Sequence, residues 1–158
     1  MSAFIDPSAR IDPTAKVWHF ARILADVTIE ADASIGGGCE IGRGSWIGEG
    51  SRIGAGTFLP PHSFIGSRVF VGPNVTCTDD MTPMVPGPND PPYVPMPPVI
   101  KDGAAIGAGA VLCPGVKIGA RARVAAGAIV TCDVPDDGFV RCEPAREQTR
   151  GSTAEMWR

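Results

Sequence analysis

The chain has 158 residues, the size of one ordinary domain, and carries 14 basic and 17 acidic side chains for a net charge of −3. This balance excludes the strongly basic surface of nucleic-acid-binding proteins, and no apolar run approaches the ~20 residues of a membrane span. With 13 Ile and 14 Val but only 3 Leu, the composition favours β-strands over a helical bundle. The first ten residues do not resemble a signal peptide, and the five cysteines contain no CxxC pair. We therefore expect a reduced, cytoplasmic protein.

Apolar residues recur at every sixth position from Ile5 to Cys77, and again from Ile100 to Val130. Four residues after each of them, a second series is mostly small, as at Ala21, Ala33 and Ser45. A period of six matches neither an α-helix nor a plain strand alternation. It predicts a short strand followed by a sharp turn, in which the aliphatic side chain points inward and the small residue fills the corner.

Three such hexads make one triangular coil, and nineteen hexads make just over six coils. Equivalent side chains then stack once per coil, at every third hexad. One interior column should contain Ile5, Ile23, Ile41, Leu59 and Cys77. The predicted fold class is all-β, a parallel β-helix of about six coils.

We expect residues 1–158 to form a single domain with four parts. Coils over 1–77 are followed by an excursion over 78–99, by further coils over 100–135 and by a tail over 136–158. Eight of the sixteen residues from 83 to 98 are proline, which cannot continue a strand ladder. The excursion is either disordered or an ordered loop that covers a site. In the tail we expect a last strand over 139–142 and a short helix within 143–158.

His62 and His19 are the only histidines. Because His62 and Asp80 are separated by three hexads, they should occupy the same corner of adjacent coils, about one strand spacing apart. An aspartate that orients a histidine is a known arrangement for a general base. The alternative is a solvated corner histidine beside an aspartate that forms a turn. His19 stacks with Gly37 and Ala55 and has no acidic neighbour by the same arithmetic.

The hexad pattern resembles the hexapeptide-repeat acyltransferases, whose fold is a left-handed parallel β-helix. A narrower resemblance rests on the segments VWHF (17–20), VFVGPNVTCTDD (69–80) and the run over 101–135 that continues to EPAR (143–146). These segments look like a subgroup that acetylates the amino group of nucleotide-linked amino sugars with acetyl-CoA. The resemblance implies a homotrimer with acetyl-CoA in the groove between two copies.

The resemblance also implies roles for individual residues. Asp79 stands where the subgroup has an asparagine that meets the sugar amine, and His19 is a candidate substrate contact. The residues implied to bind acetyl-CoA are Ala108, Gly109, Ala126, Gly127, Pro144, Ala145 and Arg146. The amine would transfer its proton to Asp79, to the His62–Asp80 pair or to the departing sulfur.

Two other functions remain open. The first is acetylation of a sugar hydroxyl, which is less nucleophilic than an amine and needs a base. The second is a β-helix that serves only as a structural or assembly module. We expect no metal, because a carbonic anhydrase of this fold needs three histidines and no Cys/His spacing is typical of structural zinc.

Overall fold

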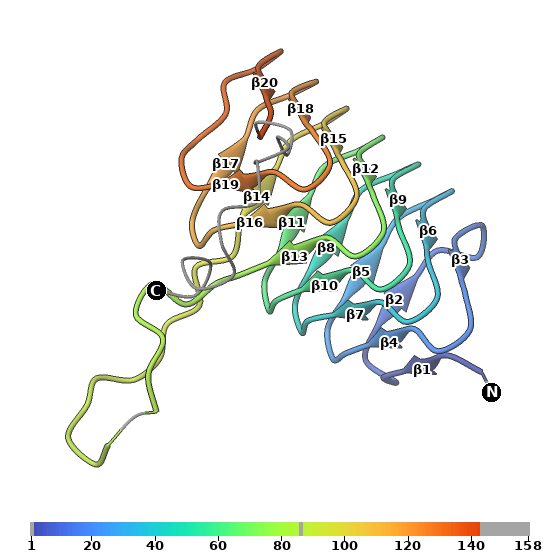
Figure 1. Ribbon diagram of the computed structural model, residues 1–158. Helices are drawn as coiled ribbons and strands as arrows, with labels where there is room; N and C mark the ends of the chain where they lie inside the picture. Colours follow the sequence, from blue (N-terminus) through green and yellow to red (C-terminus); the bar gives the residue numbers. More distant parts are fainter. Residues whose placement is uncertain (1, 86, 143–158) are drawn as a thin grey trace, which may run out of the picture.

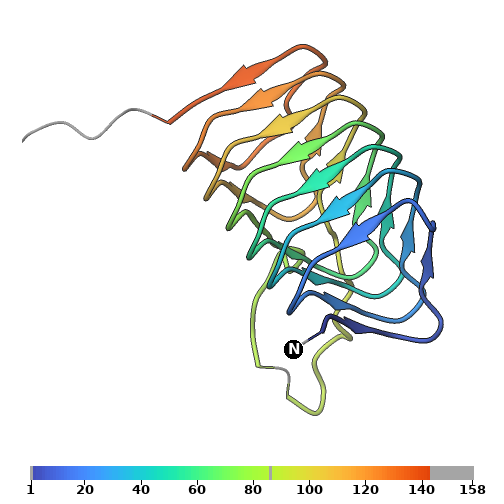
Figure 2. The same cartoon turned by 90° about the vertical axis from the view of Figure 1, so that its right-hand side faces the viewer.

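The computed structural model describes residues 2–85 and 87–142. These residues form a parallel β-solenoid of three sheets, each one face of a triangular prism (Figures 1 and 2). Sheet A contains β1 (Phe4–Ile5), β4 (Arg22–Ile23), β7 (Glu40–Ile41), β10 (Phe58–Leu59), β13 (Thr76–Cys77), β16 (Val111–Leu112) and β19 (Ile129–Val130). Sheet B contains β2 (Arg10–Ile11), β5 (Thr28–Ile29), β8 (Trp46–Ile47), β11 (Phe64–Ile65), β14 (Val99–Ile100) and β17 (Lys117–Ile118). Sheet C contains β3 (Lys16–Val17), β6 (Ser34–Ile35), β9 (Arg52–Ile53), β12 (Phe70–Val71), β15 (Ala105–Ile106), β18 (Arg123–Val124) and β20 (Phe139–Val140).

The stacking of the column expected from the hexads is confirmed by the strand register, but its first member, Ile5, lies at the open end of the solenoid and is exposed rather than interior. Ile23 pairs with Ile5 on one side and with Ile41 on the other, and Leu59 follows Ile41 in the same sheet. Ile23, Ile41 and Leu59 have no exposed surface. Each such burial contributes about 1.5–3 kcal/mol, so the stacked columns are the main source of stability.

The solenoid is close to seven coils tall, because the three sheets hold seven, six and seven strands. Nineteen of these twenty strands are the hexads counted in the sequence, and the twentieth is β20 in the tail. The last coil is shorter than the others: Val124 pairs with Val140, sixteen residues later, whereas Ile23 pairs with Ile41, eighteen residues later. This strand, β20, confirms the last strand expected in the tail, while the helix expected within 143–158 lies outside the described residues.

The turns between sheets form three corners that run the length of the solenoid. The AB corner joins sheet A to sheet B and includes residues 24–27, 42–45, 60–63 and 113–116. The BC corner joins sheet B to sheet C and includes residues 30–33, 48–51, 66–69, 101–104 and 119–122. The CA corner joins sheet C to sheet A and includes residues 18–21, 36–39, 54–57, 72–75, 107–110 and 125–128. The small residue at the end of each turn faces the core, as expected. Where this residue is a buried serine or threonine, its hydroxyl donates a hydrogen bond to a main-chain carbonyl. Ser51 Oγ, for example, donates to Gly66 O at 2.7 Å.

The chain leaves the solenoid at the AB corner after β13 and returns at β14, and the segment between them projects away from the prism (Figures 1 and 2). The register is unbroken across this excursion, since Phe64 pairs with Val99. Main-chain bonds hold its base: Met96 N donates to Asp79 O at 2.8 Å, and Gly115 N donates to Met96 O at 2.7 Å. The two arms of the excursion therefore start from a fixed point on the solenoid.

Candidate functional site

His62 lies in the AB corner on the turn that joins β10 to β11. Its backbone is left-handed, with φ 61°, and its N–H donates to Arg43 O at 2.8 Å. The exposed imidazole lies over Gly44 of the preceding coil, where an added Cβ would come within 2.7 Å of Nδ1. Gly44 therefore makes the space that the imidazole occupies.

Asp79 and Asp80 are half-buried at the start of the excursion, in the coil after His62. Asp80 Oδ1 accepts from Thr82 N at 2.9 Å, and Asp79 Oδ2 accepts from the hydroxyl of Tyr93. The hydrogen bonds of the described residues do not include one between His62 and Asp80. The structure thus brings the three expected catalytic residues to one corner, but gives each carboxylate a partner other than the histidine.

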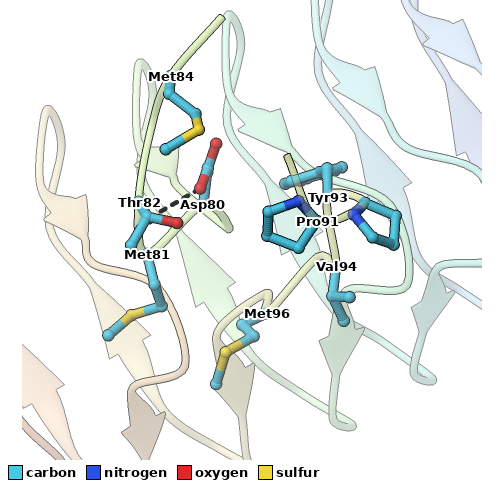
Figure 3. Close-up of a pocket in the computed structure, with 9 residues that line it drawn as sticks. Asp80, Met81, Thr82, Met84, Pro91, Tyr93, Val94 and Met96 are labelled. Carbon is cyan, nitrogen blue, oxygen red and sulfur yellow. Dashed lines mark hydrogen bonds between the residues drawn. The ribbon is translucent and has the colours of Figure 1, made fainter. Parts of the chain in front are cut away.

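A cavity of about 260 Å³ lies between the two arms of the excursion. Figure 3 shows Asp80 and Met84 on one arm, facing Pro91 and Tyr93 on the other. The full lining is Asp80, Met81, Thr82, Met84, Pro91, Pro92, Tyr93, Val94 and Met96. Apart from the Asp80 carboxylate and two hydroxyls, these side chains are apolar, which suits a ligand with a largely apolar face and one polar group.

Tyr93 was not among the residues expected from the sequence. It is the only tyrosine, and it comes from the returning arm, fourteen residues after Asp79. Partial desolvation, the hydrogen bond to Asp79 and the charges of Asp79 and Asp80 raise the pKa of Tyr93 to about 12. The phenol is therefore a hydrogen-bond donor at neutral pH.

The residues expected to bind acetyl-CoA lie at the CA corner, on the opposite edge of sheet A from His62. Ala108 and Ala126 occupy equivalent turns of adjacent coils, and Gly127 N donates to Ala108 O at 2.9 Å. An added Cβ at Gly109 or at Gly127 would meet no atom of residues 2–85 and 87–142 within 4 Å. Ala108 and Ala126 are exposed, and the Cys142 thiol lies at the same edge, where it donates to Ala126 O at 3.7 Å. Pro144, Ala145 and Arg146 lie outside the described residues.

His19 belongs to the same CA corner, at its N-terminal end. Its carbonyl accepts from Gly38 N at 3.3 Å, and its ring meets Phe20 edge-on at 6.4 Å between centroids. Trp18, His19 and Phe20 line a shallow hollow with Gly36 and Gly37. His19 precedes β4 and Asp79 follows β13, so the two are separated by the width of sheet A and by three coils along the solenoid.

The cysteines expected to be packing residues are buried. Burial raises the pKa of the Cys77 thiol to about 12 and also raises that of Cys39, so both remain protonated at neutral pH. Among residues 2–85 and 87–142, no three His, Cys, Asp or Glu side chains gather closely enough to hold a metal ion. The same part of the chain has no helix long and apolar enough to cross a bilayer.

Comparison with known proteins gives two family matches. The model described as bacterial transferase hexapeptide (six repeats) matches residues 97–132, which include the exposed edge at Ala108 and Ala126. The model described as hexapeptide repeat of succinyl-transferase matches residues 26–60.

Individual proteins are similar over parts of the chain. A stretch of 50 residues is 52% identical to a 2,3,4,5-tetrahydropyridine-2,6-dicarboxylate N-acetyltransferase from Staphylococcus aureus, and covers 32% of this chain. That stretch spans only about a fifth (21%) of the relative's own length.

Two solved structures extend the likeness. Soybean serine acetyltransferase, as apoenzyme, is 33% identical with a TM-score of 0.51, over 65% of this chain and 39% of that one. The N-acyltransferase AntD from Bacillus cereus shares the fold with a TM-score of 0.55 at 20% identity, over 96% of this chain and 86% of that one. A point mutant of AntD was crystallised with dTDP-4-amino-4,6-dideoxyglucose and coenzyme A. The repeat, the solenoid and the two family models agree: residues 26–60 and 97–132 match hexapeptide-repeat transferase models, and the coils form the left-handed parallel β-helix typical of that family.

Proposed function

We propose that the protein is an acetyl-CoA-dependent N-acetyltransferase that acts on the amino group of a nucleotide-linked amino sugar. The observation that carries the amine acceptor is the 52% identity, over 50 residues, to an N-acetyltransferase. The nucleotide-linked sugar rests on the resemblance of residues 17–20, 69–80 and 101–135 to that subgroup. AntD is an example of the same fold with CoA and a nucleotide-linked amino sugar.

In this proposal acetyl-CoA lies along the CA corner. The open space beside Gly109 and Gly127 admits a pantetheine arm close to the backbone, and the exposed methyl groups of Ala108 and Ala126 add little bulk. The acceptor lies at the AB corner, where Asp79 receives its amine and His62 presents an exposed imidazole.

These two corners are opposite edges of sheet A within one chain. A donor at one and an acceptor at the other would be separated by the width of that sheet. The proposed site is therefore completed by two copies, with the CA corner of one chain beside the AB corner of the next. A homotrimer provides three such sites and agrees with the resemblance of the sequence.

The reaction needs few chemical groups. The neutral amine attacks the thioester carbonyl carbon, the new C–N bond forms, the C–S bond breaks and CoA leaves as the thiolate. His62 accepts the proton that the amine loses, and the thiolate is the alternative acceptor. Holding donor and acceptor together can lower the barrier by up to about 7–11 kcal/mol, so positioning contributes more than acid–base chemistry.

A hydroxyl acceptor is the second candidate, and the 33% identity to a serine acetyltransferase favours testing it. A hydroxyl needs a base to become nucleophilic. Where His62 is the base, for a hydroxyl or for an amine, its replacement by alanine should lower kcat by about 10²–10⁴. For N-acetylation with the thiolate as proton acceptor, the loss should stay below about tenfold.

The first test is calorimetric titration with acetyl-CoA. We expect saturable binding with one site per chain, followed by acetyl transfer to members of a panel of nucleotide-amino sugars. Absence of binding up to millimolar acetyl-CoA refutes both acyltransferase proposals and favours a structural module.

A matched pair of variants locates the donor. Ala108→Trp fills the exposed edge at the CA corner, whereas Ala31→Trp places the same side chain on the equivalent turn of the BC corner, where Gly50 N donates to Ala31 O at 2.9 Å. We expect Ala108→Trp to weaken acetyl-CoA binding at least about tenfold and Ala31→Trp to leave it unchanged. Equal effects of the two variants would contradict a donor site at the CA corner.

A further inference from the structure

Asp79 is held twice by the returning arm of the excursion. Its main-chain oxygen accepts from Met96 N at 2.8 Å, and its side-chain Oδ2 accepts from the hydroxyl of Tyr93. Both contacts join the first residues of the excursion to its returning arm. The carboxylate of Asp79 is therefore fixed in position and in rotation, because one of its two oxygens is engaged.

The ring of Tyr93 has a second environment. It lines the cavity between the arms, opposite Asp80 and Met84 (Figure 3), while its hydroxyl reaches Asp79, which is not part of that lining. Tyr93 is thus the one side chain among the described residues that both lines this cavity and hydrogen-bonds Asp79. A molecule that enters the cavity touches the ring and comes close to the carboxylate that the hydroxyl holds.

The chemistry of the pair assigns the direction of the bond. A carboxylate only accepts hydrogen bonds, and the phenol is the donor to it. The second oxygen of Asp79, Oδ1, has no donor among the hydrogen bonds of the described residues. An amine needs an acceptor of this kind to fix the direction of its lone pair before attack.

We propose that Tyr93 is a positioning residue, which holds Oδ2 of Asp79 so that Oδ1 receives the acceptor amine, and that the acceptor packs its less polar face in the excursion cavity. The inference rests on the proposed N-acetyltransferase function for its catalytic consequence. The pairing of Tyr93 with Asp79 does not depend on that function and is tested separately.

The first experiment measures the pairing directly. Tyr93 is the only tyrosine, so the ultraviolet absorbance of tyrosinate reports this residue alone. In the wild-type chain the pKa of Tyr93 should be about 12, against an ordinary value of 10.0. At pH 11 such a phenol is ionised to about 10%, whereas an ordinary phenol is ionised to about 90%. Circular dichroism at the same pH verifies that the chain is folded.

Two variants distinguish the effect of the hydrogen bond on the pKa of Tyr93 from the effect of the nearby negative charges. Asp79→Asn should lower the pKa of Tyr93 toward its ordinary value, and Asp80→Asn, which removes a neighbouring charge without touching the hydroxyl, should lower it less. A wild-type pKa near 10, or equal shifts in the two variants, would overturn the pairing.

The second experiment measures the consequence for the acceptor. Tyr93→Phe keeps the ring in the cavity and removes only the hydroxyl. We expect the KM for the amino acceptor to rise about tenfold, the usual scale for one hydrogen bond to a charged group, while the KM for acetyl-CoA stays unchanged. A purely structural role would change both constants or neither.

An unchanged KM for the acceptor overturns the positioning role. If the wild-type chain transfers acetyl groups to no acceptor, the proposed function fails, and the titration of Tyr93 still decides whether the pair exists. The two failures are therefore distinguishable.

Discussion

The imidazole of His62 can be displaced without touching His62 itself. An added Cβ at Gly44 would lie 2.7 Å from Nδ1 and 2.9 Å from Cε1 of His62, so Gly44→Ala forces the ring to move. Because a side chain can rotate away, the clash should cost little stability. The left-handed backbone of Gly44, φ +66°, should cost about 1–2 kcal/mol when a Cβ is added.

Gly50 is a matched control in the same coil. Its φ is also +66°, but an added Cβ would meet only Arg68 Cγ, at an ordinary 3.5 Å. Gly44→Ala and Gly50→Ala should therefore lose the same stability, about 1–2 kcal/mol, in urea unfolding. Only Gly44→Ala should lower kcat, by about 10²-fold, the scale for a displacement of about 1 Å at a reacting group.

The assay is steady-state acetyl transfer beside urea unfolding of both variants. Equal kcat values would refute the role of the His62 imidazole in proton transfer. A much larger loss of stability for Gly44→Ala than for Gly50→Ala would refute the argument that the ring rotates away, because the clash would then remain in the folded state.

Two further outcomes follow from single side chains. Ser51 Oγ donates to Gly66 O at 2.7 Å and accepts from Val69 N at 2.9 Å; Ser51→Ala leaves two buried groups unpaired and should lower the free energy of unfolding by about 2–4 kcal/mol, measured in urea, whereas a loss under about 0.5 kcal/mol would contradict the pairing. The hydroxyl and the N–H of Thr14 hold the pKa of Asp12 below its usual 3.8. Because the folded pKa is depressed, the stabilisation is complete above the unfolded pKa and disappears as pH falls through the folded pKa. Asp12→Asn should therefore flatten the acid-unfolding curve below about pH 4, and an unaltered curve would argue against this contribution of Asp12.

Most of the fold was predictable because the hexad period constrains every coil independently. Ile23, Ile41 and Leu59 each indicate the same inward-facing position, and a shift of the strand register by one residue would expose all three side chains. The last strand, β20, lies outside the hexad series because it returns two positions early; it was expected from the tail residues 139–142 and not from the period. Short deviations of this kind have no periodic signal.

The site was predictable only in part. The coil repeat brings His62 and the Asp79–Asp80 pair to the same corner, but the partner of each carboxylate depends on the path of the excursion. Phe64 in β11 pairs with Val99 in β14, where the excursion returns to the solenoid. Both ends of the excursion therefore lie at the AB corner next to the coil of His62. The contact of Tyr93 with Asp79 depends on how the proline-rich arms fold back, which no repeat encodes.

The solenoid stacks coils in a single direction, so each coil contacts only its neighbours above and below. Local opening of such a stack starts as fraying at its two ends, where Ile5 is already 45% exposed. His62 and Asp79 lie in the middle coils, with paired strands on both sides. The excursion can therefore bend, or change its sequence and length over evolutionary time, while the coils that carry it stay closed.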